Sequence, residues 1–380
     1  MIPRALAKRI LTFLHRQKAI VVLGPRQVGK TTLMKTLFDP RSPDVRWYNG
    51  EEPGTQELFN EPSAQRLKTL IGDAKTVVLD EAQRINSVGL VVKLLVDDNP
   101  DVQFIVTGSS ALELAAGISE SMTGRKYDLN LYPLSFEELA AENGLLTEIR
   151  MIEHRMTYGF YPNVATQPGF EEKHLNDMYS SYLYKDLLAY QQIKKPEVLQ
   201  KLVKALALQV GNEVSYNELS QIVELDKEAV ERYIDLLEKS FVVFRLPALS
   251  RNMRNEIKRG RKIYFYDVGI RNAVLNTYNP LALRTDTGAL WENYCIVERM
   301  KALEYHGRRV NRYFWRTTTQ QEIDYIEEYD GKLYAYEFKW NPKAKVKTQK
   351  AFLEAYPGTE IKVITPKNIE EFVMIKDEKK

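Results

Sequence analysis

Cysteine is almost absent from this chain of 380 residues, which contains only Cys295. A single cysteine excludes an internal disulfide and a cysteine-based zinc site, and it suits a reducing compartment. Histidine is also scarce, and its four positions lack the spacing of a metal site. These histidines are His15, His154, His174 and His306.

Long hydrophobic runs are missing as well. No apolar stretch approaches the roughly 18 residues that a helix needs to cross a bilayer. The amino-terminal segment is interrupted by Arg4, Lys8 and Arg9, so it lacks the apolar core of a secretory signal. The sequence therefore predicts a cytoplasmic protein with no membrane partner.

The chain has no large excess of charge of either sign. Its net charge is +3, with 28% charged and 44% apolar residues, which is ordinary for a globular protein. A nucleic-acid partner would therefore have to contact a local basic patch rather than the whole surface. The length exceeds that of one typical core and predicts two or three domains.

The segment from Ala19 to Phe38 contains the most specific motif of the chain. An apolar strand-like run leads into Gly24-x-x-x-x-Gly29-Lys30-Thr31, and a helical pattern follows. Such a loop turns backbone N–H groups toward phosphate oxygens, and the helix N-terminus adds a partial positive charge. Lys30 is expected on the β- and γ-phosphates, and the Thr31 hydroxyl on Mg²⁺. The predicted ATP-binding residues are Gly24, Pro25, Arg26, Gln27, Val28, Gly29, Lys30, Thr31 and Thr32.

Strand-like segments alternate with helical patterns through the first part of the chain. This alternation predicts an α/β fold with a parallel sheet, whose functional residues gather at the carboxyl ends of the strands. The expected strands are Ala19–Leu23, Val45–Asn49, Thr76–Asp80, Val102–Thr107 and Tyr127–Leu131.

Two further strands of this set end in polar residues. Asp80 is expected to hold Mg²⁺, and Glu81 to act as the general base on the attacking water. Thr107, or the neighbouring Ser109 or Ser110, is a candidate to orient that water or to sense the γ-phosphate.

These motifs resemble the AAA+ class of P-loop ATPases. More narrowly, the chain resembles a prokaryotic family of AAA-type ATPases with a carboxyl-terminal domain of formerly unknown function. The matching segments are GPRQVGKTTL (24–33), LDEAQRI (79–85), TGSSALEL (107–114), TGRKYDLNLYPLSFEEL (123–139) and YGFYPNV (158–164). The resemblance implies a homo-oligomer in which a neighbour's arginine completes the site. Arg125 is the candidate for that arginine, with Arg84 and Arg26 as competitors.

The middle of the chain is predicted to be helical. By resemblance, residues 135–195 form the small helical lid that follows an AAA+ core. Ser215 and Asp226 are expected to cap two successive helices, and strands at Phe241–Leu246 and Lys262–Tyr266 complete the plan of a winged helix.

The two predicted faces of this winged helix differ in charge. The second helix is rich in acids, whereas the segment 251–262 carries six basic residues against Glu256. A basic wing of this kind is expected to follow a DNA backbone, and a solvated loop or a protein contact is the alternative. The six basic residues are Arg251, Arg254, Lys258, Arg259, Arg261 and Lys262.

The last hundred residues contain a second set of chemically active side chains. Residues 322–326 and 333–339 are predicted strands, joined by an acidic turn at 327–331. Asp324 on the first strand and Glu337-x-Lys339 on the second can face the same side, because side chains alternate along a strand. The two carboxylates are expected to bind Mg²⁺, and Lys339 to position or activate water for phosphodiester attack. Four lysines beyond them, Lys343, Lys345, Lys347 and Lys350, are candidates to hold a DNA backbone.

This pattern resembles the PD-(D/E)XK nuclease superfamily, which implies a metal-binding role for Glu292 on a preceding helix. The predicted domains are thus an AAA+ core (1–134), a lid (135–195), a winged helix (196–266) and a nuclease-like domain (267–380). Three functions remain open: an ATPase that couples nucleotide state to DNA binding, an ATP-gated nuclease, and a regulatory switch that binds protein.

Overall fold

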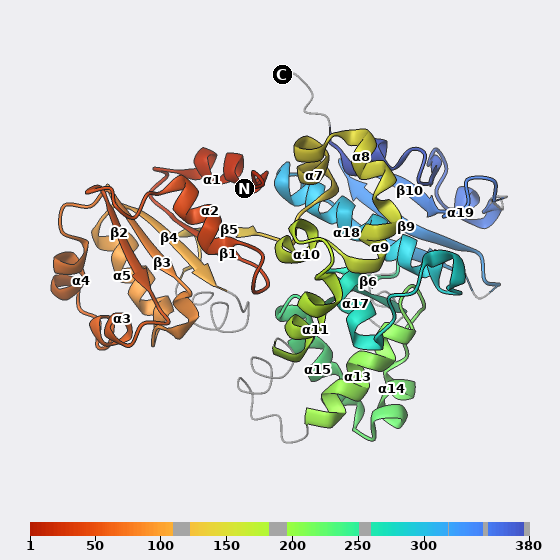
Figure 1. Cartoon of the computed structure of the whole chain (residues 1–380), viewed down its shortest axis with the longest axis horizontal. Helices are drawn as coiled ribbons and strands as arrows, with labels where there is room; N and C mark the ends of the chain where they lie inside the picture. The colour runs from red at the N-terminus through yellow and green to blue at the C-terminus, as the bar shows by residue number, and fades with distance from the viewer. Residues whose placement is uncertain (109–121, 182–195, 251–259, 318, 345–348, 376–380) are drawn as a thin grey trace. The chain divides into compact units, whose positions relative to one another are not determined.

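The computed structural model describes residues 1–108, 122–181, 196–250, 260–317, 319–344 and 349–375 (Figure 1). Its contacts divide the chain into two compact units. The first, the nucleotide unit, is Pro3–Pro133 with Lys239–Phe241. The second, the carboxyl unit, is Leu134–Glu238 and Val242–Lys380, with Met1–Ile2. The predicted divisions at residues 195 and 266 fall inside the carboxyl unit and stay predictions.

A parallel sheet of five strands, in the order β2-β3-β4-β1-β5, is the centre of the nucleotide unit (Figure 1). The prediction of an α/β fold with a parallel sheet is confirmed, and each strand lies within one residue of its expected bounds. The strands are β1 (Ala19–Leu23), β2 (Val45–Asn49), β3 (Thr76–Asp80), β4 (Gln103–Gly108) and β5 (Lys126–Asn130).

The helices of the nucleotide unit cover the sheet with apolar side chains. Leu67 of α4 and Val92 of α5 join alternate residues of β1, β3 and β4 in one buried core. The helical elements are α1 (Leu6–Phe13), α2 (Lys30–Leu37), α3 (Pro53–Leu58), α4 (Ala64–Ile71), the 3₁₀ turn η1 (Ala82–Arg84) and α5 (Val88–Asp98).

Helices form the first half of the carboxyl unit. The helices that the family resemblance assigns to a lid pack within this unit, α9 and α11 against α17. The elements are α7 (Phe136–Asn143), α8 (Leu145–Arg150), α9 (Ile152–Tyr158), α10 (Pro162–Thr166), α11 (Glu171–Ser181), α13 (Pro196–Leu208), α14 (Tyr216–Val223), α15 (Lys227–Lys239), β6 (Val243–Pro247), β7 (Arg261–Phe265), α17 (Val268–Leu275) and η3 (Leu281–Leu283).

The remainder of the carboxyl unit is a four-stranded sheet in the order β11-β10-β9-β8, next to the long helix α18. Strands β8, β9 and β10 are antiparallel neighbours, and β11 pairs parallel with β10. The elements are α18 (Thr287–Tyr305), β8 (Asn311–Arg316), β9 (Glu322–Tyr329), β10 (Lys332–Phe338), α19 (Lys350–Ala355), β11 (Ile361–Ile364) and α20 (Ile369–Val373).

The β9–β10 hairpin corrects one detail of the sequence reasoning. Residues 327–329 are expected in an acidic turn but belong to β9, and the turn is reduced to Asp330-Gly331 with φ of 50° and 72°. Two residues with positive φ are what a tight hairpin turn requires. Glu327 stays in the strand because Arg299 binds both of its carboxylate oxygens at 2.8 Å.

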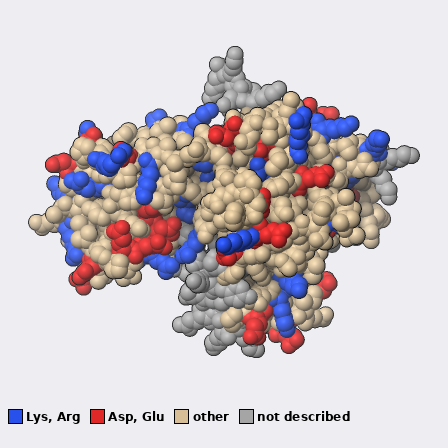
Figure 2. Space-filling view, in the orientation of Figure 1, with Lys and Arg blue, Asp and Glu red and all other residues tan. Residues whose placement is uncertain are grey.

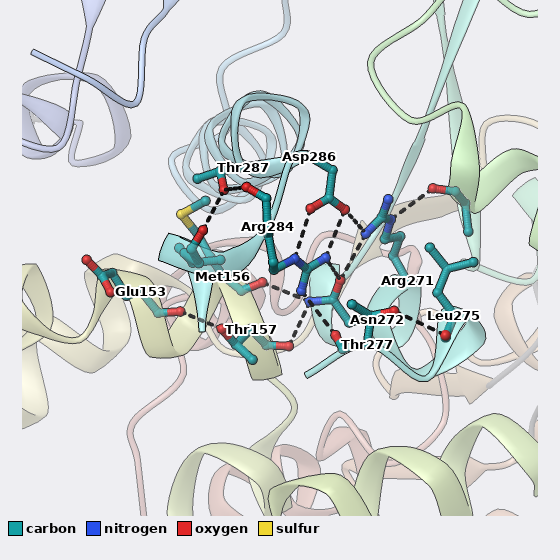
Figure 3. Close-up of polar contacts among 12 residues, drawn as sticks. Glu153, Met156, Thr157, Arg271, Asn272, Leu275, Thr277, Arg284, Asp286 and Thr287 are labelled. Carbon is teal, nitrogen blue, oxygen red and sulfur yellow. Dashed lines mark hydrogen bonds and ion pairs between the residues drawn. The ribbon is translucent and has the colours of Figure 1, made fainter. Parts of the chain in front are cut away.

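Polar clamps join the helices of the carboxyl unit. Asp286 lies between the guanidinium groups of Arg271 and Arg284, as Figure 3 shows, at 2.5 and 2.9 Å. Asn272 donates to the carbonyls of Met156 and Thr157 in α9. Helix α17 and the start of α18 are thereby fixed to α9 through buried groups.

The segment around Gly159, part of the YGFYPNV motif, also has a physical explanation. Gly159 has φ of 75°, and a Cβ there would lie 2.0 Å from Oδ1 of Asp267. The buried Asp267 carboxylate accepts the backbone N–H of Phe160 and caps α17 through the N–H groups of Gly269 and Ile270. Only glycine leaves room for this cap.

Among the described residues, no helix has the length and apolar character needed to cross a membrane.

Candidate nucleotide site and acidic cluster

The loop between β1 and α2 has the geometry of a phosphate cradle. Gln27 and Gly29 adopt positive φ values of 61° and 91°, which turns the loop sharply before the first residue of α2. A Cβ on Gly24 would lie 2.0 Å from the carbonyl oxygen of Leu131, the residue after β5. The two backbone segments approach so closely that only glycine fits at position 24. The loop thus presents backbone and the helix N-terminus, where an anion is stabilised.

Lys30 is buried under this loop, with 4% of its surface exposed. Its Nζ donates to the carbonyl oxygens of Gly24 and Pro25 at 3.0 and 2.9 Å. Burial lowers the pKa of Lys30 to about 8, and the nearby carboxylates of Glu81 and Asp80 limit the fall. The Lys30 ammonium is therefore positioned beside the loop by two neutral carbonyl groups, which phosphate oxygens can replace.

Asp80, at the carboxyl end of β3, connects the loop to β4. Its Oδ2 accepts the Thr31 hydroxyl at 2.8 Å, and its Oδ1 accepts the Thr107 hydroxyl at 2.5 Å. Thr107 in turn accepts the backbone N–H of Glu81 at 3.2 Å. The structure thus brings together the predicted Mg²⁺ and water residues from the first turn of α2 and from the carboxyl ends of β3 and β4.

Glu81 is held in an unusual backbone conformation. Its φ is 48°, and its Oε2 accepts the amide of Gln83 at 2.5 Å. Gly50 passes so close that a Cβ there would lie 2.4 Å from the carbonyl oxygen of Glu81. Strain of this kind persists where the surroundings over-determine it and is frequent at functional sites.

The oxygen donors at this edge fit a magnesium ion. Thr31 and Asp80 offer a hydroxyl and a carboxylate, the hard oxygen ligands that Mg²⁺ prefers beside phosphates. The rest of the predicted loop surrounds them: Pro25 and Val28 are buried, Arg26 is half-buried, and Gln27 and Thr32 are exposed.

Arg4 is a loop contact that the sequence reasoning missed. Its guanidinium donates to the carbonyl oxygens of Val28 in the loop and Tyr132 after β5, at 2.6 and 2.7 Å. No motif marks this arginine, because it lies 24 residues before Val28 and acts only through the fold.

Arg125 lies far from the loop within its own chain. It precedes β5, and Ala19 pairs with Lys126 at the amino ends of β1 and β5, opposite the edge that carries Gly24. Its Nε contacts Asp97 at 2.5 Å, with 40% of the side chain exposed. Arg125 can therefore approach a phosphate only in another copy of the chain. Of the competitors, Arg84 is exposed at the end of η1.

The second predicted set of residues also converges. Tyr325 pairs with Tyr336, which places Asp324 opposite Glu337 on adjacent strands. Lys339 Nζ lies 2.7 Å from Glu337 Oε2 and 3.5 Å from Asp324 Oδ2. Burial and the Asp324 charge raise the pKa of Glu337 to about 7, although Lys339 opposes the shift.

One carboxylate oxygen in this set has no partner. Glu337 is 3% exposed, and its Oε1 is buried without a hydrogen bond among the described residues. A lone buried acceptor of this kind fits a cation, and Asp324 lies beside it. Within the described residues, however, no three Asp, Glu, His or Cys side chains are grouped closely enough to hold a metal ion together.

Lys262 occupies the Glu292 carboxylate oxygen predicted to bind a metal ion. The Oε1 of Glu292 accepts Lys262 Nζ at 2.8 Å and the Tyr264 hydroxyl at 2.5 Å. Burial and Asp324 raise the pKa of Glu292 to about 7, against the effect of Lys262. The predicted helical acid is thus near Asp324 but paired with a lysine from β7.

The position of Lys262 corrects the predicted wing. Lys262 is 1% exposed and bound to Glu292 and Glu322, so it cannot follow a DNA backbone. Arg261 contacts Glu231 and Tyr216. The sequence reasoning failed here because these acids lie on other elements, far away in the chain.

The other basic residues of the wing, Arg251, Arg254, Lys258 and Arg259, lie outside the described residues, as do Lys345, Lys347, Ser109 and Ser110.

The two capped helices and the two strands expected in residues 215–266 are present within two residues of their predicted bounds, whereas their assignment to a winged helix stays a prediction. Ser215 accepts the N–H of Glu218, Asp226 accepts that of Ala229, and β6 pairs antiparallel with β7. The acids of α15 are partly neutralised from the hairpin, since Arg245 binds Asp235 and lies 3.5 Å from Glu238.

Comparisons with known families agree with the nucleotide site. An AAA domain family matches residues 16–140, a domain of unknown function (DUF8612) matches 149–280, and another (DUF4143) matches 287–376. The chain thus combines an AAA-type, ATP-binding domain with a carboxyl-terminal DUF4143 domain. The predicted AAA-type nucleotide-binding domain is confirmed by this match, which covers residues 16–140.

Relatives and solved structures add context. An uncharacterized protein of Mycobacterium tuberculosis is 27% identical over 340 residues, which is 88% of this chain and 73% of that protein. One of Haemophilus influenzae is 25% identical over 273 residues, or 66% and 68% of the two chains. The Aeropyrum pernix ORC2 protein in its ADP form is 15% identical over 63% of this chain and 85% of its own, with a TM-score of 0.32.

Proposed function

We propose that the protein binds and hydrolyses ATP with Mg²⁺ at the edge formed by Gly24–Thr31, Asp80, Glu81 and Thr107. The observation that carries this proposal is the chain of hydrogen bonds from Thr31 through Asp80 to Thr107 and on to the Glu81 N–H. It brings together the loop, the acidic pair and the neighbouring strand, which are the parts that phosphoryl transfer to water needs to position phosphates, metal and water.

Each residue has a distinct task in this reaction. The loop N–H groups bind the phosphates, and Lys30 exchanges its carbonyl partners for phosphate oxygens. Thr31 and Asp80 would hold Mg²⁺, which would neutralise charge on the phosphates. Glu81 takes a proton from the attacking water. Gln83 donates to the Glu81 carboxylate and Thr107 accepts the Glu81 backbone N–H, so both contacts hold Glu81 in position.

Substitutions at Lys30 and Glu81 separate binding from hydrolysis. Lys30→Ala is expected to lose both ATP binding and turnover, whereas Glu81→Gln is expected to bind ATP but lose turnover by at least about 100-fold. ATP binding is measured with a fluorescent analogue and turnover by phosphate release. Undiminished turnover of Lys30→Ala would refute the nucleotide site.

We further propose that nucleotide state controls nucleic-acid binding by the carboxyl unit. The arrangement of α14, α15, β6 and β7 supports this, because a helix–turn–helix followed by a hairpin is a common DNA-binding plan. Basic and acidic side chains are interspersed on the face shown in Figure 2, so contact by a local patch is expected rather than a general attraction. Fluorescence anisotropy of labelled DNA with ATP or ADP tests the coupling.

A second candidate function is metal-dependent phosphodiester cleavage at Asp324, Glu337 and Lys339. The unpartnered Oε1 of Glu337 favours it, because this buried oxygen lies beside a second carboxylate and a lysine. Nicking of plasmid or branched DNA with Mg²⁺ or Mn²⁺ is the test, with Asp324→Ala/Glu337→Ala as the control. If the wild-type chain cuts no nucleic acid with any metal or nucleotide, the nuclease proposal fails, and the nuclease-like domain is inert in either a DNA-binding ATPase or an ATP-dependent switch that binds protein.

A further inference from the structure

Lys262 is the most unexpected charged residue of the carboxyl unit. Lysine is almost never fully buried unless it is paired, and this one is 1% exposed. Strand β7 directs Lys262 and Tyr264 to the same face, because they are two residues apart. Both side chains reach Glu292 of α18.

The ammonium of Lys262 is surrounded by acids from two elements. Its Nζ lies 2.8 Å from Glu292 Oε1 and 2.5 Å from Glu322 Oε1. It lies 5.4 Å from the centre of the Phe314 ring, so β8 closes the pocket with an aromatic face. Burial opposes its charge, but Glu292, Glu322 and Asp324 outweigh burial and raise the pKa of Lys262 above its usual value.

Glu292 is enclosed by these contacts. Its Oε1 accepts two hydrogen bonds. The backbone of Gly211 lies close to its Oε2, since a Cβ added there would be 3.4 Å from that oxygen. Glu337, with its unpartnered buried Oε1, interacts electrostatically with both Asp324 and Glu292. The three carboxylates thus share one charged region, and Lys262 contributes a positive charge to it.

We propose that Lys262 is the resident cation of this acidic cluster. Its ammonium occupies the position beside Glu292 and Glu322 that a divalent cation would otherwise take, and it limits metal binding in the cluster to Asp324 and Glu337. Lys262 is therefore a positioning residue that determines how many metal ions the carboxyl unit accepts. This holds whether or not the unit cleaves nucleic acid.

The physical basis is competition for the same oxygens. A small divalent ion needs carboxylate oxygens at about 2.0 to 2.1 Å, and the ammonium of Lys262 excludes it from Glu292 Oε1 and Glu322 Oε1. Glu337 differs, because Lys339 contacts its Oε2 and leaves its buried Oε1 without a partner among the described residues.

When Lys262 is replaced by an uncharged residue of similar length, Glu292 loses its ammonium partner and Glu322 keeps only the longer contact of Arg316 Nε with its Oε2, at 3.7 Å. The Oε1 atoms of both glutamates then become available. A divalent ion then supplies the missing charge.

Mn²⁺ titration of the nucleotide-free full-length chain, followed by the EPR signal of free Mn²⁺, tests the proposal. Lys262→Met is expected to bind one Mn²⁺ more per chain than the wild type, and Lys262→Met/Glu292→Gln to return to the wild-type number. Lys262→Arg retains the cation and should match the wild type. Lys332→Met removes an exposed lysine from β10 and should also match it.

Two results would overturn the proposal. One is a folded Lys262→Met chain, judged by its thermal transition, that binds no additional Mn²⁺. The other is a lower Mn²⁺ number in Glu292→Gln alone, because the proposal requires Glu292 to hold no metal in the wild type. The second result decides the matter even if Lys262→Met does not fold. Neither depends on ATP turnover or DNA cleavage, so failure here leaves the proposed functions to their own tests.

Discussion

At the scale of single residues, the nucleotide site depends on partners that hold the loop and its lysine in place. Lys30 is recognisable from the motif, but the contacts that prepare it are not. Its carbonyl partners, Gly24 and Pro25, are visible only in the folded loop, and Arg4 contacts the same loop from outside the motif.

Arg4→Ala should weaken ATP binding without unfolding the nucleotide unit. The substitution removes two charge-assisted hydrogen bonds to Val28 and Tyr132, so the loop loses part of its preorganisation. A cost of about 1 kcal/mol corresponds to an increase in Kd of roughly 5-fold. Arg41→Ala, which removes an exposed arginine paired with Asp39, is the matched control and should leave the Kd unchanged. Equal values of Kd for Arg4→Ala and the wild type would contradict this role.

The affinity for ATP should fall as the pH rises above about 8. The pKa of Lys30 is lowered to about 8 by burial, and bound phosphates raise it again, so the protonated form binds more tightly. Above this pH the affinity is expected to decrease by up to about tenfold per pH unit, until the pKa of the complex is reached. Fluorescence titrations between pH 6.5 and 9.5 measure it. In Lys30→Arg the charge persists over this range, and any residual binding should lack the decrease.

At the scale of elements, the sequence predicts structure well where local patterns decide it. Each strand of the parallel sheet is an apolar run bounded by polar residues, and all five lie within one residue of expectation. The caps Ser215 and Asp226 act within three residues and are equally predictable.

Elements stabilised by distant partners are harder to predict. Glu327 begins an acidic stretch that predicts a turn, yet its ion pair with Arg299 of α18 keeps it in β9. Lys262 lies in a basic stretch of the sequence that predicts an exposed wing, yet it is buried and paired with Glu292 and Glu322. The convergence of Asp324, Glu337 and Lys339 was predictable from strand periodicity, whereas the insertion of Lys262 among the acids was not.

Asp286→Asn should destabilise the carboxyl unit by about 3 kcal/mol, because it leaves two buried guanidinium groups without their counter-charge. The side chains of Arg271 and Arg284 are only 3% and 2% exposed. Denaturant unfolding followed by tryptophan fluorescence measures it, since Trp291, Trp315 and Trp340 lie in this unit. Glu231→Gln, in a more exposed pair with Arg261, should change stability by at most about 1 kcal/mol.

The same ion pairs set a pH dependence. The arginines lower the pKa of Asp286 to about 2, below its value in the unfolded chain. Its contribution is therefore complete above about pH 4 and is lost as the pH falls toward 2. A difference in stability between the wild type and Asp286→Asn that persisted undiminished at pH 2 would contradict the assignment.

At the scale of the whole molecule, we propose that Arg125 acts in the nucleotide site of a neighbouring copy, so that hydrolysis requires more than one copy of the chain. Arg125→Ala should still bind ATP but lose turnover by roughly 10³-fold or more, as expected for an arginine that stabilises the transferring phosphate. Mixing Arg125→Ala with Glu81→Gln should restore part of the activity, because some interfaces then combine an intact Glu81 with an intact Arg125.

The mixing experiment also has a clear negative result. If the mixture is inactive, or if sedimentation shows a monomer with ATP while hydrolysis is normal, Arg125 does not act between subunits. Its exposed contact with Asp97 would then be its whole role.

For the whole molecule, we propose that the nucleotide state of the nucleotide unit controls nucleic-acid binding by the carboxyl unit. The most direct test is the Kd for a labelled DNA duplex, measured by anisotropy for Glu81→Gln with ATP and with ADP, and for Lys30→Ala with either nucleotide. We expect Kd values that differ at least several-fold between the ATP and ADP states of Glu81→Gln, and no nucleotide effect in Lys30→Ala. Identical DNA affinity in every nucleotide state, in a chain whose wild type hydrolyses ATP, would contradict it.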